Sequence, residues 1–367
     1  MSLKLHPRYI KKLIGHHNEK KIFEDSYLSN SLHHCWLLEG AAGIGKASFA
    51  YCAARSILSI SNRQNNEASL FPGLENQNNS NILNFSYETN NTIHNRISEN
   101  THVDLKIIER SDANKNSHSN EIIPVNKVRE IENFFSKTSG EGGWRIAIID
   151  SLDNLNKHGS NALLKILEEP PEKCLIFLIS SNKSNVIDTI KSRSRILKFS
   201  SLNIDDTNLV IENLMLIKDI AELKKINLLA NGSPGRGIML FNNNGLEIYN
   251  KLINLFLKIP DFDTNLFDSL VKDVSDVKNI FGIKIINILV TIFLIRTYKR
   301  ALKLININFS DNEQDSQENI IKNFDIKDIP FLWENIFTQI NLTADFNLDK
   351  KQAIISLINN IKELKTI

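Results

Sequence analysis

The chain has 367 residues, of which 42% are hydrophobic, so it is long enough for about two or three domains with sizeable cores. Its 44 Lys and Arg residues against 42 Asp and Glu leave a formal net charge of +2, which excludes nucleic-acid binding through bulk charge alone. The three cysteines are far apart, which argues against a disulfide framework or a Cys-x-x-Cys zinc site and favours a reducing cytoplasm.

The N-terminal residues contain no apolar core of signal-peptide length, which favours a cytoplasmic protein. The first predicted strand, residues 34–38, leads into Gly40-Ala-Ala-Gly-Ile-Gly-Lys-Ala47, a phosphate-binding loop with an altered last residue. Its glycines let successive backbone N–H groups point at phosphate oxygens, and its lysine adds a positive charge where a helix begins. A predicted helix over residues 47–58 completes the strand–loop–helix context. The predicted nucleotide-binding residues of this loop are Gly40, Gly43, Ile44, Gly45, Lys46, Ala47 and Ser48.

The last position of the loop limits its chemistry. Ala47 stands where the pattern has Ser or Thr, and it has no hydroxyl to hold Mg²⁺. Ser48 does not obviously replace it, because one residue along a helix turns the side chain by about 100°. The loop is therefore predicted to hold phosphate and to hydrolyse ATP poorly. A glycine turn without any ligand is the alternative.

The next segment, residues 61–100, is rich in Asn and Ser and has little apolar periodicity. We predict a long and partly disordered surface insertion there. Alternating apolar residues then predict a strand over residues 103–109, and apolar residues at helical spacing predict a helix over residues 124–137.

A second nucleotide-binding element is the apolar strand over residues 142–150, which ends in Asp150. In P-loop ATPases an acid at this strand end holds Mg²⁺. A carboxylate at the following position commonly positions the attacking water, but this chain has Ser151 there. With Ala47, two independent parts of the hydrolytic site are missing, which predicts lost hydrolysis. An acid that simply ends an ordinary strand is the alternative.

A third element is the basic turn Thr189-Ile-Lys-Ser-Arg-Ser-Arg195, which precedes a short strand over residues 195–199. An arginine at such a turn can stabilise the charge that develops during phosphoryl transfer. A solvated basic turn is equally consistent with these residues alone.

Strands and helices alternate up to about residue 200, which predicts a parallel sheet covered on both faces by helices. Helical patterns dominate the remainder, so the predicted fold class is α/β followed by all-α. The predicted domains are residues 1–200, a small helical domain over residues 201–243, and a larger helical domain over residues 244–367. The apolar run over residues 285–295 is too short to span a bilayer, which needs roughly 20 residues. We predict that this run is core or a subunit interface.

Several motifs occur in one order along the chain. They are Leu13-Ile-Gly-His16, Leu32-His-His-Cys-Trp-Leu-Leu38, the Gly-Ile-Gly-Lys loop, Asn161-Ala-Leu-Leu-Lys-Ile-Leu-Glu-Glu-Pro-Pro171 and the Ser-Arg-Ser turn. This series resembles the bacterial clamp-loader subunits of the AAA+ class, most closely the delta-prime type of DNA polymerase III. The resemblance implies a RecA-like AAA+ P-loop domain, a helical lid and a C-terminal helical collar.

The resemblance also implies roles for individual residues. Arg193 takes the position of an arginine finger that acts in trans on a neighbour's ATP, with Ser194 in place of the family's cysteine. Asn182 falls near the first sensor and Arg236 at the second. The four-cysteine zinc module of many family members is not matched, so no zinc or other metal site is carried over.

The function implied by the resemblance is help in loading the sliding clamp on primed DNA. The implied partners are the gamma/tau ATPase subunits and the delta subunit, in a heteropentamer without a membrane partner. The chain would be catalytically inactive alone, within a holoenzyme that is a nucleotidyltransferase. Binding of ATP and Mg²⁺ by its own loop stays open.

Two other functions remain. One is a self-sufficient ATP-hydrolysing motor of the gamma/tau type, in which Ser48 or water completes the Mg²⁺ shell. The other is a P-loop interaction protein outside replication.

Overall fold

The described part of the molecule forms two compact units. One unit comprises Met1–Leu216 and Gly232–Gly235, and the other comprises Ile217–Asn231 and Arg236–Ile367. The computed structural model describes residues 5–70, 82–87, 92–109, 123–141, 143–182, 185–215, 217, 219–258, 263–275, 282–304, 308–323, 325, 327–331, 333–335, 338 and 351–352. The three-domain division expected from the sequence stays a prediction.

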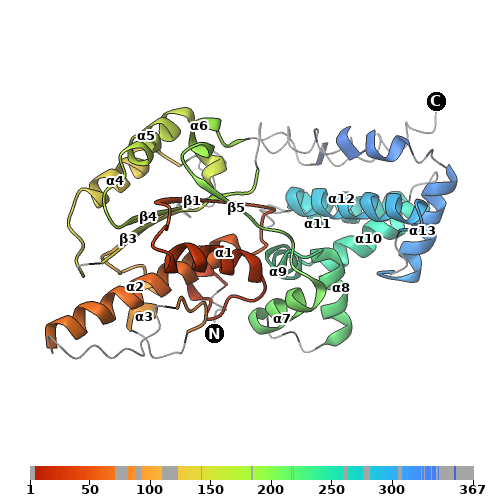
Figure 1. Cartoon of the computed structure of the whole chain (residues 1–367). Helices are drawn as coiled ribbons and strands as arrows, with labels where there is room; N and C mark the ends of the chain where they lie inside the picture. Colours follow the sequence, from red (N-terminus) through yellow and green to blue (C-terminus); the bar gives the residue numbers. More distant parts are fainter. Residues whose placement is uncertain are drawn as a thin grey trace. The chain divides into compact units, whose positions relative to one another are not determined.

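The first unit is built on a parallel sheet of five strands in the order β2-β3-β4-β1-β5, which confirms the predicted fold class (Figure 1). The strands are β1 (Cys35–Glu39), β2 (Leu105–Ile108), β3 (Arg145–Ile149), β4 (Cys174–Ser180) and β5 (Arg195–Lys198). All residues of β1, β3 and β4 are buried, as expected for central parallel strands covered on both faces.

Helices cover the two faces of this sheet. Figure 1 shows α1 (His17–Leu28), α2 (Lys46–Leu70) and α3 (Thr92–Ser98) on one side, and α4 (Val125–Phe135), α5 (Lys157–Glu168) and α6 (Asp188–Lys191) on the other. Strand β1 shows how the sequence serves both layers. Trp36 and Leu38 belong to the core under α1 and α2, whereas Cys35 and Leu37 belong to the core under α4 and α5. Alternate side chains of a strand point to opposite faces, so one short apolar run fills two cores.

The Asn-rich segment is more ordered than expected. Helix α2 continues to Leu70, well beyond the predicted end at residue 58. Within the predicted insertion, Leu83 and Phe85 are buried, and α3 buries Ile93 and Ile97 in the core under α2. Few but regularly placed apolar residues are therefore enough to dock this polar segment. Residues 71–81 and 88–91 of the predicted insertion lie outside the described residues.

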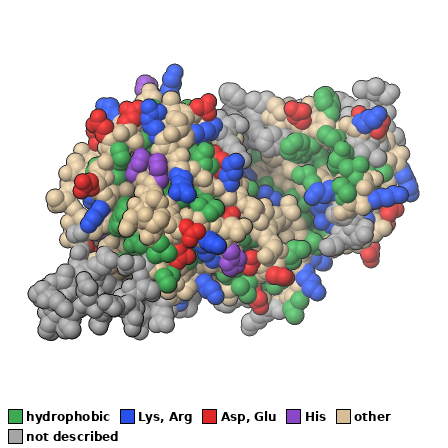
Figure 2. All heavy atoms as spheres, in the orientation of Figure 1, with side chains coloured by type: hydrophobic (Ala, Val, Ile, Leu, Met, Phe, Trp, Pro, Cys, Tyr) green, Lys and Arg blue, Asp and Glu red, His purple; other side chains and the backbone are tan. Residues whose placement is uncertain are grey.

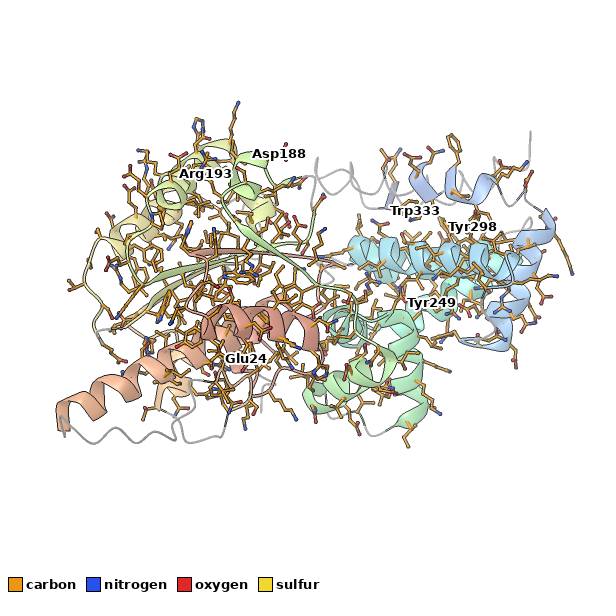
Figure 3. All side chains as sticks on the ribbon, in the orientation of Figure 1. Glu24, Asp188, Arg193, Tyr249, Tyr298 and Trp333 are labelled. Carbon is orange, nitrogen blue, oxygen red and sulfur yellow. The ribbon has the colours of Figure 1, made fainter. Side chains whose placement is uncertain are left out.

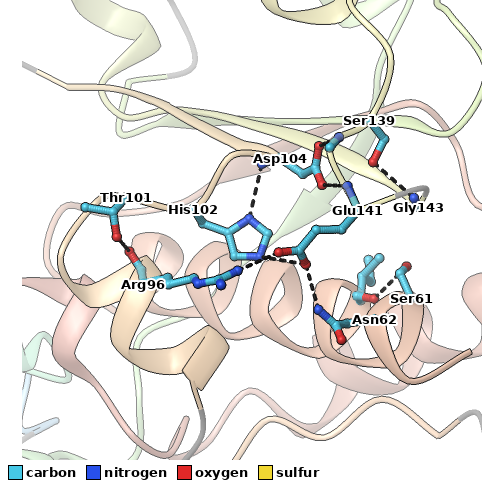
Figure 4. Close-up of polar contacts among 11 residues, drawn as sticks. Ser61, Asn62, Arg96, Thr101, His102, Asp104, Ser139, Glu141 and Gly143 are labelled. Carbon is cyan, nitrogen blue, oxygen red and sulfur yellow. Dashed lines mark hydrogen bonds and ion pairs between the residues drawn. The ribbon is translucent and has the colours of Figure 1, made fainter. Parts of the chain in front are cut away.

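A polar network anchors the same segment to the amino ends of β2 and β3 (Figure 4). Glu141 accepts hydrogen bonds from Asn62 Nδ2 (2.7 Å) and Arg96 Nη1 (2.5 Å). Its backbone N–H donates to Asp104 (3.0 Å), and the His102 ring lies 3.7 Å from its carboxylate. Burial lowers the pKa of His102. Side chains from α2 and α3 and the ring of His102 thus meet at the carboxylate of Glu141, in the segment before β3.

The second unit is helical throughout its described elements. They are α8 (Ile220–Ala230), most of α9 (Pro234–Asn242), α10 (Gly245–Leu257), α11 (Thr264–Ser275), α12 (Gly282–Ala301) and α13 (Asp311–Asn323). Helix α7 (Ile204–Met215) belongs to the first unit. The apolar run predicted over residues 285–295 forms the middle of α12 and is mostly core, although Ile295 is 41% exposed. None of the described helices is long and apolar enough to cross a bilayer.

A buried ion pair joins the helices of the second unit. Glu313 is fully buried and accepts hydrogen bonds from Arg296 Nε (2.7 Å), Arg296 Nη2 (2.8 Å) and the Tyr249 hydroxyl (2.6 Å). The backbone N–H of Phe309 donates to Glu313 Oε2 (2.9 Å), the oxygen that also accepts from Arg296 Nη2. These hydrogen bonds lower the pKa of Glu313 against the opposing effect of burial. Burial of both charges is tolerated because each has a partner.

Candidate functional site at the two ends of the sheet

The phosphate-binding loop connects β1 to α2 at the carboxyl end of the sheet. Gly40, Gly43 and Gly45 all have positive φ (155°, 76° and 111°), a conformation that favours glycine. A Cβ at Gly40 would lie 2.5 Å from the carbonyl oxygen of Phe199, so this position also needs the smallest residue. The strand–loop–helix context expected from the sequence is present, and the loop residues of the sequence prediction lie together.

Lys46 is folded back onto its own loop. Its ammonium donates to the carbonyl oxygens of Gly40 (2.7 Å) and Ala41 (2.5 Å) and to the Ser181 hydroxyl (3.3 Å). Burial lowers the pKa of Lys46 to about 8, against the opposing effect of the negative charges of Asp150 and Asp153. Since all three N–H groups of the ammonium have acceptors, a phosphate would have to replace at least one of them.

The carboxyl ends of β3 and β4 meet beside this lysine. Asp150 directly follows β3, and Asp153 lies in the short 3₁₀ turn after it. Asp153 accepts hydrogen bonds from the Ser180 hydroxyl (2.6 Å) and from the backbone N–H groups of Ser181 (2.7 Å) and Asn182 (3.4 Å). The predicted Asp150 and Asn182 therefore share one edge with the loop, and Asp153 ties the two strand ends together.

A second segment of the same unit closes over the loop. The Ser233 hydroxyl donates to the carbonyl oxygen of Ala42 (2.9 Å), and the Gly235 N–H donates to that of Gly43 (2.9 Å). A Cβ at Gly235 would lie 2.8 Å from the Gly43 Cα, so only glycine allows this approach. These contacts use carbonyl groups of the loop, whereas a bound phosphate would use its N–H groups.

His16, which directly precedes α1, holds the loop through a hydrogen bond to its backbone. It takes a left-handed backbone conformation (φ 54°), and its Nε2 donates to the carbonyl oxygen of Ile44 (2.7 Å). Its ring packs edge-on against Phe199, with 4.9 Å between ring centroids. Burial lowers the pKa of His16, which favours the neutral ring, and the bond to the Ile44 carbonyl oxygen needs the ring proton on Nε2. This histidine fixes the loop rather than offering a charge to a ligand.

The residues of this edge fit the phosphates of a nucleotide better than they fit its Mg²⁺. Ala47 and Ser151 lack the hydroxyl and carboxylate of the hydrolytic pattern, and Ser151 has a left-handed backbone (φ 72°). Ser48, the alternative hydroxyl, is buried at 7% exposure. Within the described ranges, no group of three His, Cys, Asp or Glu side chains could hold a metal ion.

Arg193 lies at the opposite end of the sheet, in the turn between α6 and β5 (Figure 3). Its side chain is 37% exposed, and its Nη2 pairs with Glu168 of α5 at 2.9 Å. Its Nη1 donates to the carbonyl oxygen of Thr189 (3.1 Å) and to the Ser192 hydroxyl (3.4 Å). Arg193 thus lies at the opposite end of the strands from the phosphate-binding loop of its own chain, and its role as a finger stays a prediction.

The residues around this turn are well packed. Ser194 donates to the carbonyl oxygen of Ile190 (2.8 Å) and lies 3.2 Å from the Cys35 sulfur. The Arg195 guanidinium stacks on the Trp36 ring at 4.9 Å from its centroid and donates to the Ser26 hydroxyl (2.8 Å). The turn therefore has a packed base, and the Arg193 side chain lies beside it, paired with Glu168 of α5.

Arg236, the predicted second sensor, belongs to the other unit and follows Gly235 directly in the chain. Burial lowers its pKa. The sensor role of Arg236 stays a prediction.

Sequence reasoning missed several contributors to these two ends. Asp153 and Ser181 could be suspected only once β3 and β4 are known to be neighbours, because residues that follow adjacent parallel strands meet. Gly235 was part of a glycine-rich turn, but nothing local showed its contact with Gly43. Glu168 was not missed in this way, because its place at the end of a helix before Pro170 predicts a structural or interface role, but its pairing with Arg193 was not foreseen.

The face of the molecule shown in Figure 2 has no large patch of only positive or only negative side chains. On the face shown in Figure 2, Lys and Arg side chains are interspersed with Asp and Glu, in keeping with the net charge of +2. Hydrophobic side chains gather on the visible part of the helical unit. Its exposed large hydrophobic residues include Ile295, Leu302, Leu304, Phe331 and Trp333.

The chain is similar in sequence to known subunits of DNA polymerase III. The family model described as DNA polymerase III, delta subunit, matches residues 15–203, just over half of the chain. A DNA polymerase III subunit gamma of Buchnera aphidicola subsp. Schizaphis graminum is 24% identical over 262 residues, which are 70% of this chain and 63% of the relative. The subunit gamma of Buchnera aphidicola subsp. Acyrthosiphon pisum is 24% identical over 100% of this chain and 93% of its own. The subunit delta' of Pseudomonas aeruginosa is 36% identical over 93 residues, 25% of this chain and 26% of its own.

Among solved structures, a DNA polymerase III gamma subunit-related protein from Thermotoga maritima aligns with a TM-score of 0.42 and 16% identity. The alignment covers 95% of this chain and 98% of that protein.

Proposed function

The chain belongs to the clamp-loader family of DNA polymerase III, and from this premise we propose that it is a delta-prime-like subunit. In this role it helps load the sliding clamp on primed DNA, hydrolyses ATP poorly or not at all, and supplies Arg193 to a neighbouring subunit. Its partners are the gamma/tau and delta subunits of a heteropentameric loader. The exposed hydrophobic side chains of the helical unit are the natural candidates for the contacts that form the collar.

The observation that carries this proposal is a loop that is formed but lacks its hydrolytic groups. The three glycines with positive φ and Lys46 are in place, whereas Ala47 and Ser151 replace the residues that would hold Mg²⁺ and position water. The three hydrogen bonds of the Lys46 ammonium further favour a resting loop. ATP binding without turnover is compatible with this arrangement.

The finger role is supported by the placement of Arg193. It lies at the end of the sheet opposite the loop, on a packed turn, with a side chain 37% exposed. An arginine finger is worth about 10³–10⁵ in rate in small GTPases. We expect a smaller loss here, at least about tenfold, because several sites share turnover in a multi-subunit loader.

A gamma/tau-like motor is the second candidate function. The observation that favours it is the alignment with a subunit gamma over the whole chain, whereas the alignment with the Pseudomonas aeruginosa delta' subunit covers 25%. The argument against it is the lack of hydrolytic groups in the loop region: Ala47 has no hydroxyl, Ser151 has no carboxylate, and Ser48 is buried.

Steady-state ATP turnover by a reconstituted loader, with clamp and primed DNA, tests both candidates. The loader would contain this chain, its Arg193→Ala variant, or Arg129→Ala, in which an exposed arginine on α4 is removed as a control. We expect no ATP turnover by the isolated chain and clear turnover by the complete loader. Of the two variants, only Arg193→Ala should lower the rate of the loader.

Two results would overturn the proposal in different ways. Unchanged turnover with Arg193→Ala would remove the finger and leave a structural subunit. Strong turnover by the isolated chain would establish a motor of the gamma/tau type.

A further inference from the structure

Arg193 is already paired within its own chain. Its Nη2 contacts the Glu168 carboxylate at 2.9 Å, while its Nη1 is held by the neutral acceptors Thr189 O and Ser192 Oγ. A guanidinium presents its donors in a rigid fork that suits carboxylate and phosphate equally. The carboxylate thus occupies donors that an anionic ligand would use.

Glu168 stands at a position that a helix alone would disfavour. It is the last residue of α5, which Pro170 prevents from continuing. The carbonyl end of a helix carries partial negative charge, so an acid there is repelled unless a cation lies nearby. Arg193 supplies that cation. The same partial charge also attracts Arg193 to this place.

The pair is suited to exchange. The side chains of Arg193 and Glu168 are 37% and 51% exposed, so water screens their attraction and opening the pair disturbs no core. A triphosphate carries more negative charge than one carboxylate. The contacts with Thr189 and Ser192 involve the other nitrogen, so the guanidinium can leave Glu168 and stay anchored.

We propose that Glu168 is a positioning residue that holds Arg193 in a resting, charge-paired state until a neighbouring subunit presents an anionic group. This inference rests on the proposed finger role of Arg193. In the resting state the finger is neutralised and turned toward α5. Engagement exchanges the carboxylate of Glu168 for the terminal phosphate of the neighbour's nucleotide.

A second acid nearby, at the start of α6, provides a matched control. Asp188 is 96% exposed and pairs with Lys191 at 3.1 Å (Figure 3 labels Asp188 beside Arg193). Asp188→Asn removes a negative charge from α6, just before the turn, without removing the partner of Arg193.

The test is a double-mutant cycle in the complete reconstituted loader, with ATP turnover measured with and without clamp and primed DNA. Glu168→Gln keeps the size and the carbonyl acceptor of the side chain but removes its charge. We expect turnover without DNA to rise about two- to fivefold, the range of a weak exposed ion pair, and turnover with DNA to stay unchanged. The rise should vanish in the Arg193→Ala background, and Asp188→Asn should not produce it.

The outcomes separate this inference from the proposed function. If Arg193→Ala lowers turnover and Glu168→Gln has no effect, or the same effect with and without Arg193, the resting pair is wrong and the finger stands. If Arg193→Ala changes nothing, both are wrong.

A measurement on the isolated chain needs no partner. The ¹⁵N signals of the Arg193 guanidinium, assigned by their loss in Arg193→Ala, report rotation about the Nε–Cζ bond. We expect faster rotation in Glu168→Gln than in the wild type or Asp188→Asn. Equal rotation in all three would overturn the inference.

Discussion

The two ends of the parallel sheet are built in opposite ways. At the carboxyl end, the polar groups near the loop are satisfied within the chain: Lys46 by carbonyl oxygens, Asp153 by backbone N–H groups, and the loop carbonyls by Ser233 and Gly235. At the amino end, Arg193 is paired with Glu168, and this ion pair is partly exposed to water.

The two ends therefore differ in how easily their polar groups can change partners. A phosphate-binding loop that is pinned on both sides costs much to rearrange, whereas an exposed ion pair costs little. In an enzyme that hydrolyses its own ATP, the loop end would carry the chemistry. In this chain the polar groups at the loop end have partners within the chain, whereas the exposed ion pair of Arg193 lies at the other end.

The sharpest test of that rigidity is Gly40→Ala. The new Cβ would sit 2.5 Å from the Phe199 carbonyl oxygen on a backbone with φ 155°, so the free energy of unfolding should fall by about 3 kcal/mol. Urea unfolding monitored by circular dichroism measures it. The control is Gly159→Ala in α5, where the nearest atom is the end of the Leu155 side chain at 3.1 Å and the change should stay within about 1 kcal/mol. Equal losses for the two variants would contradict a specially constrained loop.

The charge of Lys46 gives a second test at the loop end. Burial lowers its pKa to about 8, so the protonated fraction falls roughly tenfold between pH 7 and pH 9. If the loop binds ATP through this ammonium, the affinity for a fluorescent ATP analogue should weaken by about the same factor over that range. Lys46→Gln should bind weakly at both pH values. Affinity independent of pH in the wild type would show that the ammonium is not used.

Buried histidines make stability depend on pH at both ends. Burial lowers the pKa of His16 beside the loop and of His102 before β2. As the pH falls, these histidines therefore bind protons more readily in the unfolded chain than in the folded chain. Stability is therefore full above the unfolded pKa of about 6.5 and falls as the pH drops below it, by up to about 1.4 kcal/mol per histidine at pH 5.5. Urea unfolding at pH 7.5 and 5.5 should show a smaller pH effect in His102→Asn than in the wild type. The exposed His17 is the control, and His17→Asn should leave the effect unchanged.

The smallest effect is expected at the amino end. Glu168→Gln should change the free energy of unfolding by no more than about 0.5 kcal/mol, because exposed ion pairs contribute little. A loss near that of Gly40→Ala in the same urea experiment would mean that the pair is structural, and the contrast between the two ends would fail.

Local signals in the sequence were sufficient for the strands and the loop. Short apolar runs, glycines at fixed spacing and the Pro170-Pro171 stop each act over a few residues, and the sheet they predicted is confirmed. The length of α2 was missed, because its second half is rich in Asn and Ser, which have low helix propensity, and has little apolar periodicity. The contacts of Asp153 with Ser181 and of Glu168 with Arg193 depend on which strands and helices are neighbours, and no local pattern contains that information.

The stacking of Arg195 on Trp36 makes the fluorescence of this tryptophan sensitive to the position of the arginine. The chain has three tryptophans, and the indole of Trp36 is fully buried beneath a guanidinium two residues from Arg193. Indole emission responds to a nearby positive charge, so any movement of Arg195 away from the ring would change the fluorescence of Trp36. With Trp144 and Trp333 replaced by Phe, the protein carries its own reporter of the finger turn and needs no attached dye.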